Sequence, residues 1–388
     1  MKKYKVLKFG GTSLASPESI KKVKQIIEET NNVKAIVVSA PGKSNEFSLK
    51  VTDALILAHL KKDKFNYYMN YVKLVLFNII SNLEIDFDLD KELNKITWHY
   101  RIFKTKSYLI SRGEYLSAKI LSKYLNIPFI DSKNVIKFAK DGKLHPKTYK
   151  NIQSIAKTHD KFIVSGFYGS NTFSKIKLRS RGGSDITGSV VSRALKNAVY
   201  ENYTDVDGLK DISPKLKTNT RVISKINYKD MYFLSFYGAS VLHYKCSKIF
   251  NNGFTVIKNT FNNSAITTKL NPKYKNIKFA LSITSGYQIV FNEKNKSVYK
   301  LLQKLHHEKL YSFSRLGLCF YGFRTSTLNN CEKILFNLKK YIKEYKKILV
   351  YALIGDLSKL KQKIQNKHKD FIFCFYYKNK TNIVYYDE

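Results

Sequence analysis

Cysteine is scarce in this 388-residue chain, and the four cysteines lie far apart. They are Cys246, Cys319, Cys331 and Cys374, and no two of them form a C-x-x-C pair. This spacing argues against a disulfide framework and against a zinc site, so we expect free thiols in a reducing compartment. The chain also lacks an apolar run of 18 residues and the charged and apolar regions of a secretory signal. These absences predict a cytoplasmic protein without membrane contact.

Acidic residues are also few, with 29 Asp and Glu against 69 Lys and Arg, which gives a formal net charge of +40. Such a charge favours binding to polyanions. The lysines, however, are spread from end to end among many Asn, Ile, Tyr and Phe residues, and they outnumber arginine, which is better suited to base and phosphate contacts. This mixture is typical of codon bias in an AT-rich genome. We therefore predict a solvated basic surface, weak nonspecific adhesion to RNA and no specific nucleic-acid partner.

The hydrophobic pattern predicts an α/β domain over residues 1–270. At 44% hydrophobic residues, the chain is long enough for two or three domains. Short apolar strands alternate with helices, which indicates a sheet covered by helices. We expect strands at residues 4–9, 33–40, 162–165 and 199–204, and helices at residues 51–60, 65–80 and 107–124.

The pattern changes after two polar stretches at residues 262–264 and 271–272. A strand is expected at 281–291, a helix at 296–307, strands within 310–323, a helix at 330–345 and a strand at 348–354. This β-α-β-β-α-β order is ferredoxin-like. Only a helix at 358–365 and two strands within 371–386 remain, so a second such unit would be incomplete. The predicted domains are therefore 1–270, 271–346 and 347–388.

The most informative segment is the end of the first strand. Lys8 and Phe9 lead into Gly10-Gly11-Thr12-Ser13, and Ser16-Pro17 then opens an amphipathic helix as N-cap and N1. Two glycines allow a ligand to come close to backbone N–H groups, and the lysine supplies a positive charge, so this segment predicts a phosphate site. It is not a Walker loop, because its lysine precedes the glycines.

Further polar segments follow at the ends of predicted strands. Ser39 ends one strand, the segment Ser111-Arg112-Gly113-Glu114 is expected to begin a helix, and Ser165–Gly169 has flanking glycines. Ser180–Thr187 forms a second glycine loop with an arginine and an aspartate, and 204–208 follows another strand. Alone, Glu114 and Asp185 could be first-turn carboxylates and Asp207-Gly208 a simple turn. Together, the two loops suit a polyphosphate beside a small zwitterion.

In this order, the segments resemble the aspartate kinase family within the amino acid kinase superfamily. The resemblance rests on Lys8–Ser13, Val38–Lys43, Lys50–Asp53, Ser111–Glu114, Ser180–Asp185, Thr204–Gly208 and Gly238–His243. It implies a three-layer α/β/α amino acid kinase domain followed by ferredoxin-like ACT-type units, the last one incomplete, and a homodimer. The implied reaction transfers the γ-phosphoryl group of ATP, with Mg²⁺, to L-aspartate. The product would be 4-phospho-L-aspartate, the first intermediate toward lysine, threonine and methionine.

The resemblance also implies roles for individual residues. Lys8 would contact the transferring phosphoryl group, and Asp185 would orient the amino acid end of the site. The implied substrate-binding residues are Ser39, Thr52, Glu114, Phe167, Arg181 and Ser184, with Arg181 on the α-carboxylate and Glu114 on the ammonium group. The implied ATP-binding residues are Lys8, Phe9, Gly10, Gly11, Thr204, Asp205, Lys210 and Lys215, and no metal-ligand set is implied because phosphate oxygens and water would hold most of the Mg²⁺.

Several positions depart from the family pattern. Ser240 stands where many members carry a lysine on the nucleotide phosphates, and Tyr244 replaces a proline. Lys210 and Lys215 stand where many members have Tyr and Arg, which keeps the charge but loses the guanidinium fork. Two alternatives stay open: a related kinase with another acid substrate, and a catalytically silent ACT-type regulatory subunit. The inhibiting amino acid, the oligomer size and the ATP affinity also stay open.

Overall fold

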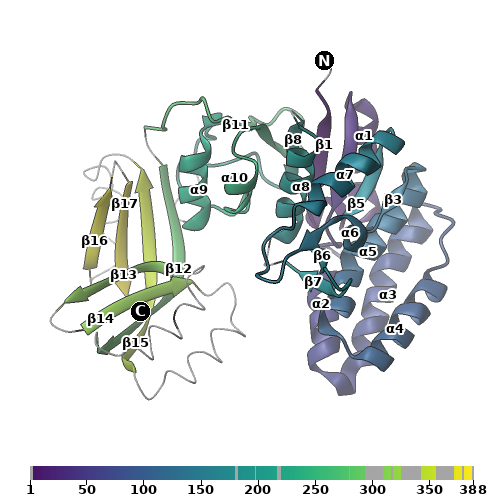
Figure 1. Ribbon diagram of the computed structural model, residues 1–388, viewed down its shortest axis with the longest axis horizontal. Coiled ribbons are helices and arrows are strands. Elements are labelled where there is room, and N and C mark those ends of the chain that lie inside the picture. The colour runs from purple at the N-terminus through teal and green to yellow at the C-terminus, as the bar shows by residue number, and fades with distance from the viewer. Residues whose placement is uncertain are drawn as a thin grey trace. The chain divides into compact units, whose positions relative to one another are not determined.

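The computed structural model describes residues 3–179, 182–196, 198–215, 220–278, 280–292, 302, 309–315, 318–324, 342–354, 371–377 and 380–386. The chain divides into two compact units (Figure 1). The first comprises residues 1–209, 222–228 and 241–274, and the second comprises 210–221, 229–240 and 275–388.

An eight-stranded sheet forms the centre of the first unit. Its strand order is β3 (Phe129–Ile130), β5 (Phe162–Ser165), β2 (Val33–Val38), β1 (Lys5–Phe9), β8 (Val199–Thr204), β10 (Phe254–Asn259), β11 (Thr268–Leu270) and β9 (Lys225–Ile226). Only the β10–β11 pair is antiparallel. All six residues of β2 are buried, as expected for a parallel strand covered on both faces. The four long strands predicted for this unit are confirmed.

Helices cover both faces of this sheet (Figure 1). On one face, a single hydrophobic core joins Leu7, Phe9, Ile36 and Val38 to α1 (Pro17–Glu29), α2 (Val51–Leu60), α3 (Phe65–Asn82), α4 (Leu89–Phe103) and α5 (Lys106–Leu125). On the other face, α8 (Gly183–Ala194) packs on β1, β2 and β8 and contacts α7 (Lys147–Thr158) and α10 (Cys246–Ile249). Because side chains alternate along a strand, Lys8 faces α8 rather than the core of Leu7 and Phe9. The predicted α/β fold is confirmed.

Strand β1 lies where the chain order of the sheet reverses. It pairs with β2 on one side and with β8 on the other, and both pairs are parallel. In open α/β sheets, ligands bind beyond the carboxyl ends of the strands at such a reversal. The loop at Gly10 therefore lies where a ligand site is expected. The first unit also contains a smaller sheet of β4 (Lys137–Phe138), β6 (Tyr168–Asn171) and β7 (Ile176–Leu178). A short helix, α6 (Ser132–Val135), precedes β4.

The start of α1 shows the predicted cap. Ser16 is extended, its Oγ accepts a hydrogen bond from the N–H of Ser19, and Pro17 occupies N1. We expect Ser16→Ala to lower the free energy of unfolding by about 1 kcal/mol, because a donor of the first turn loses its acceptor. Ser16→Asp keeps an acceptor and should stay near wild type. Denaturant titration of the three proteins checks this, and equal stability of Ser16→Ala and wild type would contradict it.

The second unit contains a six-stranded antiparallel sheet. Its order is β13 (Lys309–Arg315), β14 (Leu318–Arg324), β12 (Ala280–Asn292), β15 (Ile342–Ile354), β17 (Lys380–Tyr386) and β16 (Phe371–Tyr377). Residues 229–236 of α9 (Tyr228–Phe236) also belong to this unit. The strands expected at 281–291, 310–323 and 371–386 are confirmed.

The prediction of a helix at residues 330–345 is wrong at its C-terminal end. Residues 342–345 were predicted to close a helix, but they begin β15, and Ile342 pairs with Phe291 of β12. Lysine and glutamate favour a helix only weakly, so pairing along the whole of β12 outweighs local propensity. The earlier part of that helix and the helix at 358–365 lie outside the described residues. The helix at 296–307 does too, apart from Leu302.

Candidate active site

A buried ion pair lies at the carboxyl end of β1. Lys8 is only 6% exposed, and its Nζ lies 2.6 Å from Oδ1 of Asp185 in the first turn of α8. The other carboxylate oxygen of Asp185 accepts a hydrogen bond from the backbone N–H of His243 at 3.2 Å. Asp185 therefore holds the Lys8 ammonium group in place. Side chains 177 positions apart in the sequence meet here because β1 and α8 pack on each other.

The glycines after β1 bring two loops together. A Cβ on Gly11 would lie 3.0 Å from the carbonyl oxygen of Ala40, and a Cβ on Gly42 would lie 2.7 Å from the carbonyl carbon of Gly11. The N–H of Gly42 donates to the Gly11 carbonyl at 2.8 Å. Glycine is thus required where the loop after β1 contacts the loop after β2. This contact also places Ser39, which follows β2 and donates its N–H to the Phe9 carbonyl at 3.2 Å.

The N–H of Gly10 already has a partner in the structure. It donates to the carbonyl oxygen of Tyr203 at 3.2 Å, and the ring of Tyr203 stacks on that of Phe9 with centroids 4.9 Å apart. The resemblance implies that Gly10 contacts ATP, and in the structure its N–H joins β1 to β8. A Cβ at Gly10 would lie 3.5 Å from Nζ of Lys8, so the loop passes close to the ammonium group.

Glu114 is a buried carboxylic acid in the middle of α5. The segment at Ser111 was expected to begin a helix, but α5 begins at Lys106, so Glu114 is not a first-turn residue and the helix dipole does not explain it. Glu114 is 4% exposed, and its Oε2 has no hydrogen-bond partner in the described part of the chain. Burial raises the pKa of Glu114 to about 8, opposed by hydrogen bonding at its own backbone, at Ala40 and at Thr52. Glu114 therefore has an unused acceptor that suits a cationic ligand group.

Aromatic rings enclose the neighbouring Arg112. Its guanidinium carbon lies 4.6 Å from the centroid of Tyr108 and 4.3 Å from that of Tyr115, and the residue is 4% exposed. Its Nη2 donates to Oγ of Ser111 at 2.9 Å. Cation–π contacts of this kind stabilise a buried guanidinium group. Arg112 also acts to lower the pKa of Glu114, but burial is the larger effect. Sequence reasoning assigned no role to Arg112, because its contacts come from the fold.

Phe167, Gly166 and Ser184 form one contact group between β5 and α8. Phe167 has φ of 72°, the left-handed region that is rare for bulky residues. A Cβ on Gly166 would collide with Oγ of Ser184, and a Cβ on Gly183 would lie 2.7 Å from Cδ2 of Phe167. The N–H of Gly166 donates to the carbonyl of Val38 at 2.8 Å, next to Ser39. The structure thus brings Ser39, Phe167 and Ser184 into one neighbourhood.

Thr204 and Asp205 end β8 beside the loop after β1. Oδ1 of Asp205 accepts from the Thr204 hydroxyl at 3.1 Å, and Oδ2 accepts from the Thr12 hydroxyl at 3.2 Å. The two hydroxyl groups fix the carboxylate at the strand end. The predicted nucleotide-side residues Thr204 and Asp205 therefore lie next to the glycine loop.

Three predicted site residues are not placed beside this group. Arg181 lies outside the described residues, as does Ser180. Lys210 and Lys215 belong to the second unit. Sequence reasoning also missed two partners, the backbone N–H of His243 on Asp185 and the Tyr200 hydroxyl, which donates to the Asp185 carbonyl at 3.2 Å. No sequence signal identifies such backbone contacts.

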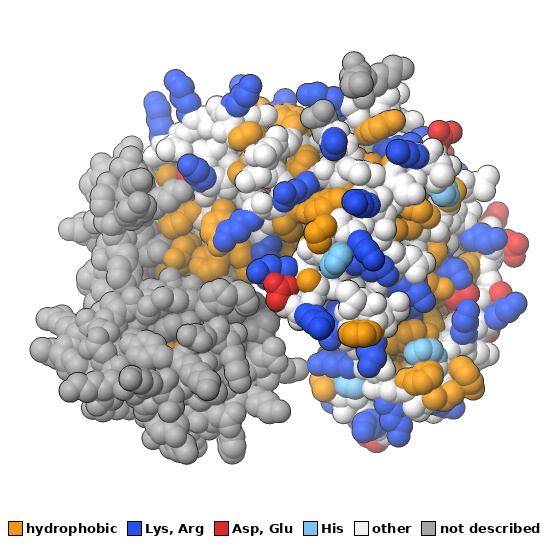
Figure 2. Space-filling model, viewed as in Figure 1, with side chains coloured by type: hydrophobic (Ala, Val, Ile, Leu, Met, Phe, Trp, Pro, Cys, Tyr) orange, Lys and Arg blue, Asp and Glu red, His pale blue; other side chains and the backbone are white. Residues whose placement is uncertain are grey.

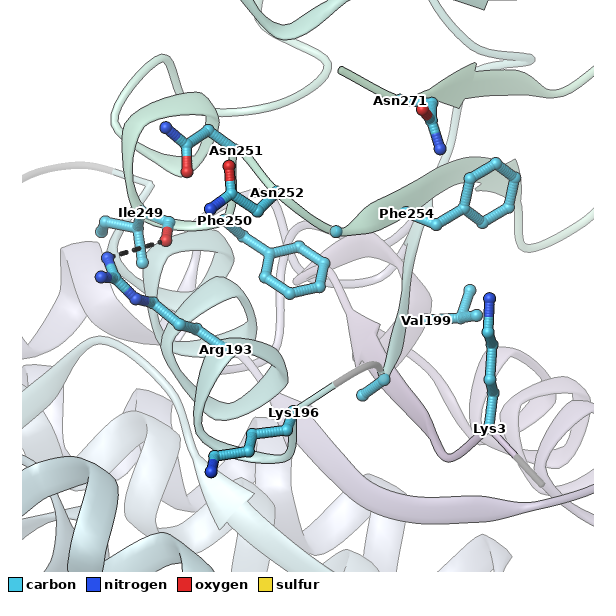
Figure 3. A pocket seen from close by; sticks show the side chains of 12 residues that line it. Lys3, Arg193, Lys196, Val199, Ile249, Phe250, Asn251, Asn252, Phe254 and Asn271 are labelled. Carbon is cyan, nitrogen blue, oxygen red and sulfur yellow. Dashed lines mark hydrogen bonds between the residues drawn. The ribbon is translucent and has the colours of Figure 1, made fainter. Parts of the chain in front are cut away.

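A cavity of about 400 Å³ lies at the opposite end of the sheet (Figure 3). Its lining includes Lys3 before β1, Val199 at the start of β8 and Phe254 at the start of β10. These are amino ends of parallel strands, whereas the loops at Gly10 and Ser39 follow carboxyl ends. Arg193, which Figure 3 shows against Ile249, donates to the carbonyl of Ile249 at 3.1 Å. We therefore separate this cavity from the candidate active site.

The fold and the site residues together define the class of protein to which this chain belongs. Residues 3–259, about two thirds of the chain, match the amino acid kinase family, and the chain belongs to that family. Within it, the chain is similar to aspartokinases. It is 32% identical to "Aspartokinase 3" of Bacillus subtilis over 297 residues, which cover 70% of this chain and 64% of that protein. It is also 32% identical to a "Bifunctional aspartokinase/homoserine dehydrogenase" of Buchnera aphidicola, covering 62% of this chain and 33% of that protein. The chain thus spans less than two thirds of these relatives.

Solved structures of aspartate kinases have a similar fold. That of Clostridium acetobutylicum aspartate kinase superimposes with a TM-score of 0.78 at 29% identity, covering 98% of this chain and 96% of the other. E. coli aspartokinase III in complex with aspartate and ADP gives a TM-score of 0.83 at 20% identity, with coverages of 99% and 96%, and supports the fold. In the part of the chain that the structure describes, no helix is both long and apolar enough to cross a bilayer.

Proposed function

We propose that this protein is an aspartate kinase, which transfers the γ-phosphoryl group of ATP to the β-carboxylate of L-aspartate. The observation that carries the proposal is the buried Lys8–Asp185 pair at the reversal point of the sheet, between two glycine loops. The similarity to aspartokinases supports the same substrate. In this proposal, the reaction is the first step toward lysine, threonine and methionine.

Charge neutralisation and alignment are the chemistry that these residues can supply. The β-carboxylate of free aspartate has a pKa of about 3.9, so it is ionised at neutral pH and needs no general base. Lys8 would neutralise charge on the phosphoryl group as it moves from ADP to the carboxylate oxygen. Asp185 would keep the Lys8 ammonium group in position rather than accept a proton.

Two charged side chains would bind the amino acid substrate. Glu114 has a buried, unpaired oxygen and would accept the substrate ammonium group. Arg181 would bind the α-carboxylate through its guanidinium fork. Ser39, Thr52, Phe167 and Ser184 would line the pocket.

The nucleotide would be bound by Gly11, Thr204 and Asp205. Phe9 would support the loop that follows β1. Lys210 and Lys215 would add positive charge. Among the described residues, no group of three or more His, Cys, Asp or Glu side chains could hold a metal ion. In this proposal Mg²⁺ would enter with ATP on phosphate oxygens and water, where it would neutralise phosphate charge.

The second unit would consist of ACT-like folds, with boundaries near residues 270 and 346. Its antiparallel sheet supports the ACT-like folds. Because β15 continues through residue 346 to Ile354, the second boundary would lie after that strand. Such units would join two chains into a homodimer in the cytoplasm. We propose no nucleic-acid partner. On the described part of the face in Figure 2, Lys and Arg side chains are scattered among uncharged ones.

An assay with purified protein tests the function. We expect ATP, Mg²⁺ and aspartate together to give an acyl phosphate that hydroxylamine traps as a hydroxamate. Product with glutamate but not aspartate would replace the proposal by a kinase of another acid. No product with any acid would favour a silent regulatory subunit. Adding lysine or threonine to the active assay identifies an inhibitor.

A further inference from the structure

A second cavity lies beside the β6–β7 hairpin, separate from the residues of the candidate active site. Its volume is about 480 Å³, within the range of small-molecule sites. The lining comes from the β4 end, from the β6–β7 hairpin and from Ile186 and Lys245. It includes none of Lys8, Gly10, Gly11, Glu114 or Asp185. A ligand here would not occupy the site proposed for phosphoryl transfer.

The most unusual lining residue is Arg179. Its Nε and Nη2 atoms are buried and have no hydrogen-bond partner among the residues that the structure describes. The guanidinium carbon lies 4.9 Å from the ring centroid of Phe138, so one face of the group is covered by an aromatic ring. Burying an unpaired guanidinium group is costly, and an orphaned group of this kind in a folded protein calls for a missing partner.

Further cationic residues line the same cavity as Arg179. They are Lys140, Lys177 and Lys245, and none of the described lining residues is an aspartate or glutamate. Asp141, in the turn after Lys140, forms an ion pair with Lys143 at 3.0 Å. Burial lowers the pKa of Arg179 to about 10, which leaves the group charged at neutral pH. The described lining of the cavity is therefore basic.

We propose that this cavity binds a phosphate group, either inorganic phosphate or the phosphate of a small metabolite. A guanidinium fork and nearby ammonium groups are the donors that proteins use for such an anion. Phe138, Phe173, Leu178 and Ile186 give the cavity apolar walls, on which the organic part of a phosphorylated metabolite would lie.

The cavity is connected to the candidate active site through the backbone. The N–H of Arg179 donates to the carbonyl of Phe167 at 2.8 Å. A Cβ on Gly183 would lie 2.9 Å from the Cβ of Arg179. An anion bound to Arg179 would therefore fix the position of the end of β7, which precedes the second glycine loop at residues 180–187.

Calorimetric titration with inorganic phosphate at constant ionic strength tests the proposal without any assay of catalysis. The variants are Arg179→Met, which keeps the apolar stem on Phe138, Arg179→Lys, which keeps charge but not the fork, and Lys157→Met as a control. Lys157 is an exposed residue of α7 outside the cavity. We expect Arg179→Met to weaken binding by roughly 10- to 100-fold, the effect of one or two charge-assisted hydrogen bonds. Arg179→Lys should fall between, and Lys157→Met should match wild type.

The glycine loop at Lys8 could also bind phosphate, so the titration is repeated in a Lys8→Met background. The Arg179→Met effect should persist there unchanged, because the two sites share no residue. Without phosphate, Arg179→Met should not lower the unfolding temperature, since it removes an unpaired buried charge. Phosphate binding that is absent in wild type, or equal in wild type and Arg179→Met, would overturn the proposal. Succinate binding as tight as phosphate would overturn the choice of a phosphate group.

Discussion

Lys8→Met is expected to lower kcat by roughly 10²- to 10³-fold, the effect of removing one preorganised group that stabilises transition-state charge. The aspartate KM should change much less, because Lys8 would act on the phosphoryl group rather than on the amino acid. The structural reason is the position of its Nζ, which Asp185 holds at 2.6 Å next to the loop at Gly10. Steady-state kinetics with the hydroxamate assay measure both parameters.

Two controls separate catalysis from folding in the Lys8 experiment. Lys21→Met removes an exposed lysine on α1 and should leave kcat unchanged. The double variant Lys8→Met/Asp185→Asn removes both charges, so any loss of stability caused by an unpaired Asp185 should be partly recovered while kcat stays low. A normal kcat in folded Lys8→Met would remove Lys8 from the mechanism.

The strands could be predicted because their sequences are locally consistent. Residues 33–38 and 162–165 are short apolar runs rich in β-branched residues, and both form buried strands of the sheet. The cap at Ser16 followed from the serine and proline alone. In contrast, the end of the helix expected at 330–345 failed, because partner strand β12 decides the structure of residues 342–345.

The site could be predicted as a set of loops but not as a set of contacts. Sequence order placed Lys8, Ser39 and Asp185 next to strand or helix ends, and the sheet brings such ends together. The pairing of Lys8 with Asp185, and the use of the Gly10 N–H by Tyr203, depend on how β1, β8 and α8 pack. Neither is visible in local spacing. The burial of Glu114 was missed for the same reason, because it comes from the packing of α5 on α2 and β2.

Glu114 is expected to make aspartate binding depend on pH. With a pKa of about 8 in the free enzyme, most Glu114 side chains are neutral at pH 7, and a neutral acid cannot pair with an ammonium group. Binding must then first remove the proton. We expect the aspartate KM to rise roughly tenfold for each pH unit below about 8, while kcat at saturating aspartate changes little. Initial rates between pH 6 and 8 measure this dependence.

Glu114→Gln removes the titrating group while keeping its size. Its aspartate KM should exceed that of wild type at pH 8 and should not vary between pH 6 and 8. A wild-type KM that is constant over this range, or a variant that keeps the wild-type slope, would contradict the role of Glu114. Thr158→Ser, on the exposed end of α7, serves as a variant with no expected effect.

The same substitution has an opposite effect on stability. The pKa of Glu114 is raised in the folded protein, so the stability that its neutral form contributes is fully present below the unfolded pKa of about 4.5. That contribution is lost as the pH rises through about 8, because the unfolded chain ionises freely while the buried group does not. Glutamine has no such loss. We therefore expect Glu114→Gln to be the more stable protein at pH 8 by several kcal/mol, with the difference shrinking toward pH 5. Denaturant titrations at the two pH values decide it: a difference between Glu114→Gln and wild type that is the same at pH 5 and pH 8 would contradict a raised pKa at Glu114.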